Sequence, residues 1–401
     1  MAEGDYFIYN RRSMENAGNI VVTCPKGIVP FLSREISRLG FTIFNESVAG
    51  VTTEGTLRDA QKLNLLLRTG HRVLYFLKDF EARSGEELYS GIAAIPWEKY
   101  IPEDGHICVA SSVDTTTVRD SRYPNLKCKD AIVDRLRLRY NRRPDSGPGK
   151  QGAVVFLYWK DDRCSVYLDT SGEPLSKRGY RKIPLKAPMQ ETLAAAVVIQ
   201  TGWDGENSFI NPMCGSGTLA IEAALIGLNR APGLSRDDFG FMHLKGFDRR
   251  AWEELRAQAE KVSREKLPGR IIATDRDPEA VAAARKNAEK AGVAGLIEFG
   301  TCDYAETVVP GGGGVVVINP EYGERMGSEK ELETTYRGIG DFFKQKCRGY
   351  RGYIFTGNMT LSKMVGLRSR RRVPFFSGAI ECRLLEYELY EGSRKIERGQ
   401  T

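Results

Sequence analysis

Few residues in the sequence are suited to binding a metal. Three histidines occur among 401 residues, and none of the eight cysteines forms a Cys-x-x-Cys pair. Structural zinc sites and redox dithiols depend on such short spacings. We therefore expect no metal site, and the isolated cysteines indicate a reduced, cytoplasmic protein.

Long apolar runs are also absent. No stretch approaches the ~20 residues needed to span a bilayer, and the first residues are more polar than a signal peptide. Hydrophobic residues make up 41% and charged residues 28% of the chain, as in ordinary globular proteins. These proportions exclude a membrane bundle, a collagen-like fibre and a largely disordered chain, and we expect no membrane partner.

One segment carries much of the positive charge. Lys and Arg number 59 against 52 Asp and Glu, a net charge of +7. Nine of the basic residues lie between positions 119 and 143, where three acidic residues occur. A helix predicted over residues 125–139 carries five of them and would present their charges to RNA phosphates. A solvated amphipathic helix would explain the same pattern, so both interpretations stay open at this point.

The order of predicted elements changes near residue 185. Before it, short strands and helices follow one another in a βαββαβ-like order, which is typical of an α+β fold. After residue 189, strands and helices alternate, which indicates a doubly wound α/β domain. The predicted parts are a polar extension (1–19), two α+β parts (20–84 and 85–185) and an α/β domain (186–401).

A glycine-rich turn follows the first predicted strand of the α/β domain. It reads Asn211-Pro-Met-Cys-Gly-Ser-Gly-Thr218 and precedes a predicted helix. Glycines allow close backbone approach to a ligand, and a helix N-terminus favours anionic groups. The turn also matches a dinucleotide fingerprint, but the next strand-end acid, Asp275, lies 58 residues after Gly217 rather than about 20. An insertion over roughly 232–269 would explain this gap, and a plain strand-to-helix turn would explain the glycines.

Polar residues end the predicted strands that follow. Asp275 can accept both ribose hydroxyls of a nucleoside, and Asp303 can accept the amino group of adenine. Asn319 and Pro320 end an apolar strand, and their oxygens can accept the two N–H bonds of an exocyclic base amine. Tyr322 can stack on a base held out of its helix. Helix capping and an Asn-Pro turn explain single members of this series, but not all of them in order.

These residues carry a resemblance to a known family. Gly215-Ser-Gly217, Asp275, Asp303 and Asn319-Pro-Glu-Tyr322 resemble motifs I to IV of class I S-adenosylmethionine-dependent amino-methyltransferases. Over about residues 20–390 the chain is similar to THUMP-domain 23S ribosomal RNA guanine-N2 methyltransferases. The segments that carry this closer likeness are 130–134, 178–180, 187–188, 191–196, 230–234 and 322–325.

The resemblance implies both a fold and a partner. It implies a ferredoxin-like α+β part at 20–84, a THUMP RNA-binding domain at 85–185 and a Rossmann-like class I methyltransferase domain at 186–401. The implied cofactor is S-adenosylmethionine, and the implied reaction is methylation of the N2 amine of a guanine. The implied partner is 23S rRNA or a large-subunit assembly intermediate.

Family roles can be carried over residue by residue. The implied catalytic residues are Asn319, Pro320 and Tyr322. The implied cofactor-binding residues are Pro188, Glu191, Thr192, Asn211, Pro212, Cys214, Gly215, Gly217, Thr218, Asp275 and Asp303, with Pro188, Glu191 and Thr192 at the methionine end. The expected RNA-binding residues are Arg119, Arg122, Lys127, Lys129, Arg178 and Arg181.

Two positions depart from the family pattern. Motif I usually begins with Asp where this chain has Asn211, so a carboxylate that could face the cofactor's ammonium group becomes a neutral amide. Motif IV usually reads Asn-Pro-Pro-Tyr, and this chain has Glu321 in place of the second Pro. A carboxylate there could accept the N1–H of guanine and repel N1 of adenine, or it could simply point to water. Both amine acceptors are retained, so we expect an active enzyme.

Three other functions fit parts of the sequence. An adenine-N6 methyltransferase acting on RNA or DNA would share motif IV. A catalytically silent RNA-binding protein would fit the changes at Asn211 and Glu321. A nicotinamide oxidoreductase fits least well because of the spacing of Asp275. Longer members of the family carry a second methyltransferase domain, and from this sequence we expect a single activity.

Overall fold

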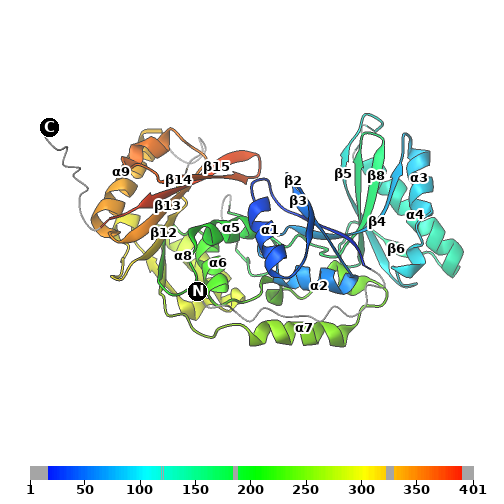
Figure 1. Ribbon diagram of the computed structural model, residues 1–401, viewed down its shortest axis with the longest axis horizontal. Helices are drawn as coiled ribbons and strands as arrows, with labels where there is room; N and C mark the ends of the chain where they lie inside the picture. Colours follow the sequence, from blue (N-terminus) through cyan, green and yellow to red (C-terminus); the bar gives the residue numbers. More distant parts are fainter. Residues whose placement is uncertain (1–16, 119, 121, 184–187, 322–328, 391–401) are drawn as a thin grey trace. The chain divides into compact units, whose positions relative to one another are not determined.

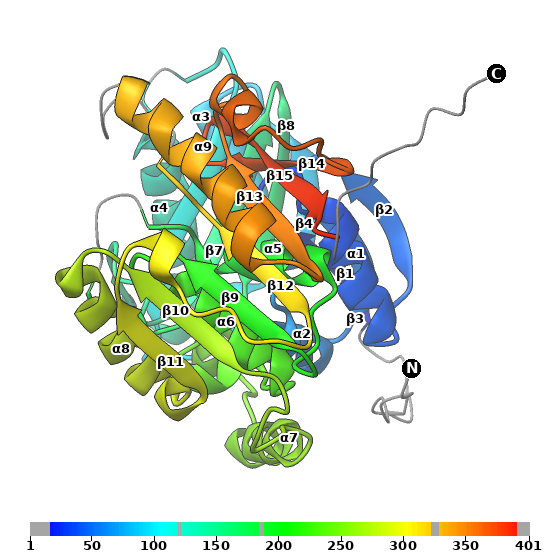
Figure 2. The same cartoon turned by 90° about the vertical axis from the view of Figure 1, so that its left-hand side faces the viewer.

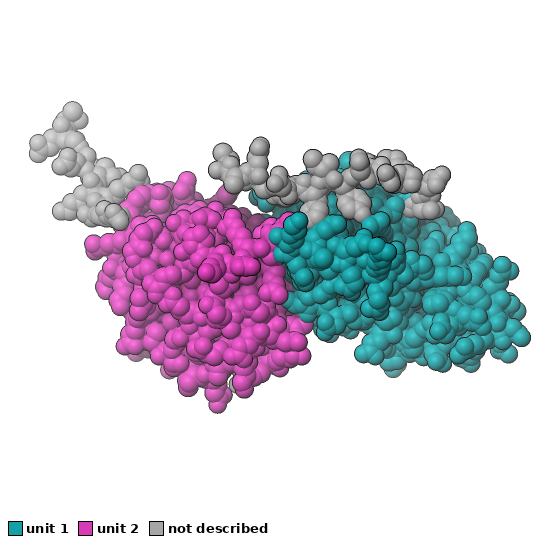
Figure 3. All heavy atoms as spheres, turned by 90° about the horizontal axis from the view of Figure 1, so that it is seen from below, with its two compact units in different colours: residues 1–25, 29–177, 231–261 teal, residues 26–28, 178–230, 262–401 magenta. Residues whose placement is uncertain are grey.

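The computed structural model of the protein describes residues 17–118, 120, 122–183, 188–321 and 329–390. The chain forms two compact units, coloured separately in Figure 3. The first comprises Met1–Pro25, Val29–Lys177 and Ala231–Lys261, and the second comprises Lys26–Ile28, Arg178–Arg230 and Val262–Thr401. The chain therefore passes between the units five times, whereas a simple division near residue 185 would require one passage.

One eight-stranded sheet runs through the first unit in the order β2-β3-β1-β4-β8-β7-β5-β6 (Figure 1). Its first part has the predicted βαββαβ order: β1 (Gly18–Thr23), α1 (Val29–Arg38), β2 (Ile43–Ser47), β3 (Gly50–Gly55), α2 (Leu57–Leu66) and β4 (Arg72–Glu81). Its second part comprises α3 (Gly85–Ala93), η1 (Trp97–Lys99), β5 (His106–Asp114), α4 (Arg122–Tyr140), β6 (Asp145–Ser146), β7 (Ala153–Lys160) and β8 (Arg163–Asp169). Antiparallel pairing of β4 with β8 joins the two parts. The α+β prediction is confirmed.

Helix α4 is the predicted basic helix. Cys128, Ile132 and Leu136 recur every four residues and are fully buried against the rest of the unit. Arg137 and Arg139, in its last turn, are exposed to solvent. The helix therefore buries an apolar stripe and leaves basic side chains on the surface.

The second unit contains a seven-stranded sheet in the order β11-β10-β9-β12-β13-β15-β14. The parallel strands are β9 (Ser208–Pro212), β10 (Ile271–Asp275), β11 (Ile297–Thr301), β12 (Gly314–Ile318) and β13 (Tyr350–Thr356). Strands β15 (Ile380–Glu388) and β14 (Arg371–Ser377) add an antiparallel edge. The strand order reverses between β9 and β12, the kind of switch point at which α/β folds bind ligands. The doubly wound prediction is confirmed.

Helices cover this second sheet. They are α5 (Glu191–Thr201), α6 (Thr218–Gly227), α8 (Pro278–Ala291) and α9 (Glu329–Lys346), with the short turns η4 (Ala294–Leu296), η5 (Tyr304–Glu306) and η6 (Leu361–Val365). Figure 2 shows α9 lying across the near face of the sheet. Tyr336, Ile339 and Phe343 of α9 share one buried cluster with Val316 and Ile354 of the central strands. This packing holds β12 and β13 in place beside the switch point.

The connection between α6 and β10 leaves the second unit. Ala231–Lys261 forms η2 (Pro232–Ser235), η3 (Gly240–His243) and α7 (Arg249–Lys261), all within the first unit. A Cβ at Gly233 would lie 2.7 Å from Leu65 Cα, and one at Gly240 would lie 2.3 Å from the Asp169 carbonyl oxygen. The sequence predicts an insertion here but assigns it to the α/β domain. The structure differs, because close backbone packing ties the segment to the α+β parts.

Arg236 links the inserted segment to the backbone that follows β8 through hydrogen bonds. Its buried guanidinium group donates to the backbone oxygens of Ser171, Glu173 and Pro174 at 3.0–3.1 Å. The same group lies 4.5 Å from the centroid of the Phe239 ring. Charge-assisted hydrogen bonds to buried carbonyls are among the stronger polar contacts of a fold.

We expect Arg236→Ala to lower the free energy of unfolding by about 2–4 kcal/mol, because three backbone carbonyls would lose their donor. Urea unfolding of the full chain followed by tryptophan fluorescence measures the change, since Trp97, Trp159 and Trp252 all lie in the first unit. The control is Arg250→Ala, which removes an exposed ion pair on α7 and should cost less than about 0.5 kcal/mol. Equal losses in the two variants would contradict the role given to Arg236.

Candidate cofactor-binding and catalytic site

The strand-end residues predicted from the sequence meet at one edge of the second sheet. In the parallel register, Thr274 pairs with Pro212 and Asp275 with Thr301, so β9, β10 and β11 end at the same level. Strand β12 pairs with β9 on its other side and leads directly into Asn319 and Pro320. The glycine-rich loop, the strand-end acids and the Asn-Pro pair therefore surround the switch point.

Backbone conformation explains the glycines of the loop. Gly215 and Gly217 have φ of +53° and +82°, in the left-handed region that favours glycine. A Cβ at Gly217 would lie 2.9 Å from the Cβ of Ala284, so α8 can approach only because that Cβ is missing. At Gly215, apart from its two chain neighbours, no atom of the described residues lies within 4 Å of the position that a Cβ would take. The backbone of Gly215 is thus open to close approach by a ligand.

The carboxylate of Asp275 links β10 to this loop. Its Oδ2 accepts the Gly215 N–H at 2.9 Å, and its Oδ1 accepts the Asp277 N–H at 3.0 Å. The side chain is half-buried. Two backbone donors fix the orientation of the carboxylate, so its remaining lone pairs present a preset pair of acceptors for hydroxyl groups.

Cys214 lies within the same loop and is 8% exposed. Burial, followed by the nearby Asp275 carboxylate, raises the pKa of its thiol well above the usual range. The thiol therefore stays protonated at neutral pH, and a protonated thiol is a poor nucleophile. Cys214 shapes the loop, where its N–H donates to the Thr274 carbonyl oxygen at 2.9 Å.

Asn211 connects the two strands of the switch point. Its side chain is fully buried, and its Nδ2 donates to the Val317 carbonyl oxygen at 2.9 Å. An aspartate carboxylate, the family's usual group here, could not donate this bond. The amide thus fixes the end of β12, two residues before Asn319.

Several buried acceptors in the site have no hydrogen-bond partner within the described part of the chain. They are the Oδ1 atoms of Asn211 and Asn319 and the Oγ1 of Thr192. Buried polar atoms are seldom left without a partner, because desolvation without a hydrogen bond is costly. These atoms fit a ligand that brings N–H or O–H donors to the switch point, as an amino acid moiety or a base amine would.

The other predicted cofactor residues differ in exposure. Pro212 is buried at the end of β9, Thr218 at the start of α6 and Glu191 at the start of α5. Asp303 is exposed and caps η5 by accepting the Ala305 N–H at 2.9 Å. Pro188 is exposed.

The predicted catalytic residues are only partly described. Asn319 is half-buried and Pro320 is buried, directly after β12. Glu321, the next residue, is exposed. Tyr322 lies outside the described residues, so its stacking role stays a prediction.

Two arginines of the predicted RNA-binding set form ion pairs within the second unit, and their contact with RNA stays a prediction. Arg178 is 2% exposed and forms an ion pair with buried Glu222, with Nε and Oε1 3.4 Å apart. Arg181 donates to Glu191 Oε1 at 3.0 Å and has a side chain 16% exposed. Burial beside carboxylates leaves little of either side chain at the surface. No spacing in the sequence links these arginines to acids 10 and 44 residues away.

The remaining predicted RNA-binding residues lie on the first unit. Arg122 is exposed and pairs with Asp120, and Lys129 pairs with Asp130 at 2.8 Å. Lys127 is half-buried. Arg119 lies outside the described residues.

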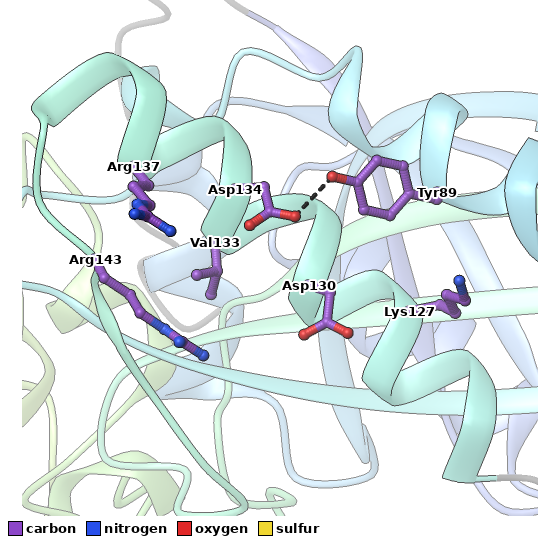
Figure 4. Close-up of a pocket in the computed structure, with 7 residues that line it drawn as sticks. All are labelled: Tyr89, Lys127, Asp130, Val133, Asp134, Arg137 and Arg143. Carbon is purple, nitrogen blue, oxygen red and sulfur yellow. Dashed lines mark hydrogen bonds between the residues drawn. The ribbon is translucent and has the colours of Figure 1, made fainter.

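Lys127 also lines a cavity of about 340 Å³ between α3 and α4 (Figure 4). Its lining residues are Tyr89, Lys127, Asp130, Val133, Asp134, Arg137 and Arg143. The Tyr89 hydroxyl donates to Asp134 at 2.7 Å, and this bond raises the pKa of Tyr89. The cavity mixes both signs of charge, so its electrostatics alone do not identify a ligand.

Among the described residues, no cluster of three or more His, Cys, Asp and Glu side chains could hold a metal ion. Within the same residues, no helix is long and apolar enough to cross a membrane.

Three family models match the chain in sequence order. The RlmL ferredoxin-like domain matches residues 19–74, the THUMP domain residues 82–169, and the RMKL-like methyltransferase domain residues 178–386, just over half of the chain. The chain belongs to the RMKL-like methyltransferase family. The resemblance inferred from the motifs is thus confirmed, together with its ferredoxin-like, THUMP and methyltransferase parts.

Curated relatives agree with this assignment. The chain is 36% identical to the ribosomal RNA large subunit methyltransferase K/L of Syntrophotalea carbinolica, over 92% of this chain and 53% of that protein. It is 34% identical to slr0064 of Synechocystis sp., a protein provisionally named an RNA methyltransferase, over 92% of this chain and 96% of that protein. The chain spans about half the length of the first curated relatives that it matches.

A solved structure shares the whole architecture. SMU.472, provisionally assigned as a methyltransferase and crystallised in complex with SAH, matches with a TM-score of 0.85 at 28% sequence identity. The match covers 95% of this chain and 100% of that chain. This likeness confirms the class I methyltransferase fold with its preceding α+β parts.

Because the Asn211 amide is buried, replacing it by a carboxylate should make the free energy of unfolding depend on pH. In Asn211→Asp a buried carboxylate would face the Val317 carbonyl oxygen, so its folded-state pKa would rise above the unfolded value. The loss of stability should therefore be small near pH 4 and grow as the pH rises, to about 2–4 kcal/mol at pH 8. Urea unfolding of the full chain at both pH values measures it.

The matched control is Asn229→Asp, at an exposed position of the same unit. It should change the free energy of unfolding by less than about 0.5 kcal/mol at either pH. An Asn211→Asp variant as stable as the wild type at pH 8 would show that the bond to Val317 contributes nothing.

Proposed function

We propose that the chain transfers a methyl group from S-adenosylmethionine to the exocyclic N2 amine of a guanine in 23S rRNA, either as free RNA or within a large-subunit assembly intermediate. The observation that carries the proposal is Asn319 Oδ1, which is buried without a hydrogen-bond partner among the described residues, beside Pro320 and next to the glycine-rich loop at the switch point. Membership of the methyltransferase family supports the reaction class. The rRNA methyltransferase K/L name of curated relatives supports the substrate.

The residues around the switch point suit the proposed cofactor. When bound, S-adenosylmethionine supplies a methyl group on a positively charged sulfonium centre. Asp275, oriented by two backbone N–H groups, would accept the ribose hydroxyls, and the open backbone at Gly215 would lie beneath the cofactor. The buried acceptors of Thr192 and Asn211, together with Glu191, would receive the N–H donors of the methionine end.

Asn319 and Pro320 would prepare the target amine. An exocyclic base amine is a poor nucleophile, because its lone pair is delocalised into the ring. The Asn319 Oδ1 and the Pro320 carbonyl oxygen would accept its two N–H bonds, which orients the nitrogen and increases its electron density. Tyr322 would stack on the extruded base. This arrangement needs no covalent intermediate on the enzyme, in keeping with the protonated thiol of Cys214.

Glu321 supports guanine over adenine as the target. It follows Pro320 directly and is exposed, so its carboxylate would be accessible to a base edge. Guanine presents an N1–H donor beside its N2 amine, whereas adenine N1 is an acceptor. A carboxylate beside this edge would bind guanine and repel adenine.

The first unit would bind the RNA substrate. Helix α4 leaves Arg122, Arg137 and Arg139 on the surface, and Lys127 and Lys129 lie on the same helix. Such basic side chains bind phosphates without reading sequence, and their binding weakens as salt rises.

An assay of product identity tests the reaction. Labelled S-adenosylmethionine, the full chain and unmodified 23S rRNA should give N2-methylguanosine after digestion of the RNA. Asn319→Ala should lower kcat/KM by ~10²-fold or more, because it removes a polarising acceptor, while SAH affinity changes only a few-fold. The control Asn229→Ala should keep full activity. N6-methyladenosine as the product would contradict guanine as the target, and no product at all would favour a silent RNA-binding protein.

The salt dependence of binding tests the RNA-contacting helix. Lys127→Ala combined with Lys129→Ala should reduce the slope of log affinity against log salt by up to ~2, about 0.7–0.9 per lost phosphate contact. The matched control combines Lys286→Ala with Lys290→Ala, two exposed lysines of α8. If both double variants keep the wild-type slope and affinity, α4 is not the RNA footprint.

A further inference from the structure

The segment that enters the second unit is tied to its helices by buried side chains. Glu222 of α6 accepts the Tyr180 hydroxyl at 2.9 Å and pairs with Arg178 at 3.4 Å. All three side chains are buried. The chain is therefore held against α6 just before it reaches Arg181.

Arg181 joins three parts of the candidate cofactor site. Its Nη2 donates to the Met189 carbonyl oxygen at 2.7 Å and to Thr218 Oγ1 at 3.2 Å, and its Nη1 lies 3.4 Å from Ser216 Oγ. Its Nε donates to Glu191 at 3.0 Å. One guanidinium group thus connects the start of α5, the glycine-rich loop and the first residue of α6. Such a planar fork of donors can serve several acceptors in one fixed geometry.

Asn287 of α8 holds the same loop from another side. Its Nδ2 donates to the Ser216 carbonyl oxygen at 3.1 Å, and its Oδ1 accepts the Lys182 N–H at 2.9 Å. Ser216, between the two left-handed glycines, is therefore held through its side chain by Arg181 and through its backbone by Asn287. The loop conformation depends on both residues.

The charge on Glu191 also depends on Arg181. Burial raises the pKa of Glu191, and the neighbouring Glu222 raises it further. Arg181 acts in the opposite direction, by its charge and by its hydrogen bond. The Tyr180 hydroxyl also lies within electrostatic range of Glu191. Among the groups that act on Glu191, Arg181 is the cation that favours its ionised form.

We propose that Arg181 is a positioning residue for the cofactor: it holds Glu191, Ser216 and Thr218 in one arrangement, so that the start of α5 and the glycine-rich loop receive the methionine end together. The inference rests on the proposed use of S-adenosylmethionine. It assigns Arg181 to the cofactor and not to RNA. A group that preorders its neighbours lowers the cost of ordering them on binding.

Binding of SAH to the full chain, measured by calorimetry, tests the proposal. Arg181→Gln removes the charge and should weaken SAH binding by about 10–100-fold, the equivalent of one or two charge-assisted hydrogen bonds. Affinity for rRNA should stay within about 2-fold of the wild type, since the guanidinium group is enclosed in the second unit. The control Arg264→Gln breaks an exposed pair with Glu206 and should leave both affinities unchanged.

The pH dependence of SAH affinity distinguishes a positioning role of Arg181 from a general loss of structure in the variant. Without Arg181, Glu191 becomes partly protonated at low pH, so the ratio of variant to wild-type Kd should be larger at about pH 6 than at about pH 8.5. In a Glu191→Gln background that difference should vanish. Arg181→Lys keeps the charge but cannot reach four acceptors, so it should restore a flat pH ratio while SAH affinity stays reduced. This lysine variant also keeps the test available if Arg181→Gln fails to fold.

Two results would overturn the inference. Wild-type SAH affinity at both pH values in Arg181→Gln would remove the positioning role. Loss of rRNA affinity with SAH affinity retained would assign Arg181 to the RNA. A wild-type chain that binds no SAH would be a different result, because it would overturn the proposed function and the inference with it.

Discussion

The candidate site depends on how closely α8 approaches the glycine-rich loop. That approach is possible because Gly217 has no Cβ, which would otherwise lie 2.9 Å from Ala284. Asn287 lies three residues after Ala284 on the same helix, on the adjoining part of its face, and it reaches the Ser216 carbonyl oxygen. Arg181 then holds the Ser216 side chain. The close contact thus fixes the conformation of the loop, and with it the positions of the strand-end residues that surround it.

The sequence predicts those residues of the site that lie at the ends of parallel strands. Parallel strands place their carboxyl ends at one edge, so Asp275 and Asn319 could be expected to lie together once the alternating pattern was recognised. The burial of Arg178 and Arg181 could not be predicted, because an isolated arginine in a sequence carries no information about its surroundings. Their acids lie on helices α5 and α6, and only the folded chain brings them together. Long-range ion pairs of this kind leave no periodic signal.

The inserted segment Ala231–Lys261 is a second feature that the sequence predicts only in part. Its length could be predicted from the wide gap between the glycine-rich loop and Asp275, but its packing could not. Phe239, Phe241 and Trp252 form an aromatic cluster in the first unit, and Arg236 bonds to backbone beside β8. A fragment beginning near residue 186 would therefore carry this apolar cluster without the strands and helix that cover it. A division of the chain by sequence order alone therefore cuts through the first compact unit.

Under the proposed function, the two departures from the family pattern concern the same physical quantity, the placement of negative charge around a positively charged cofactor. Asn211 carries an amide where the family usually has a carboxylate. Its Nδ2 donates a hydrogen bond to the Val317 carbonyl oxygen near the end of β12, which a carboxylate could not do. Glu321 carries a carboxylate where the family usually has proline. The number of acids at these two positions is unchanged, but the charge moves from the cofactor loop to the residue after the Asn-Pro pair. Since sulfonium charge disperses as the methyl group is transferred, a carboxylate is less favourable there in the transition state than in the ground state. A contact with the guanine N1–H would offset that cost, and adenine, whose N1 is an acceptor, would not provide it.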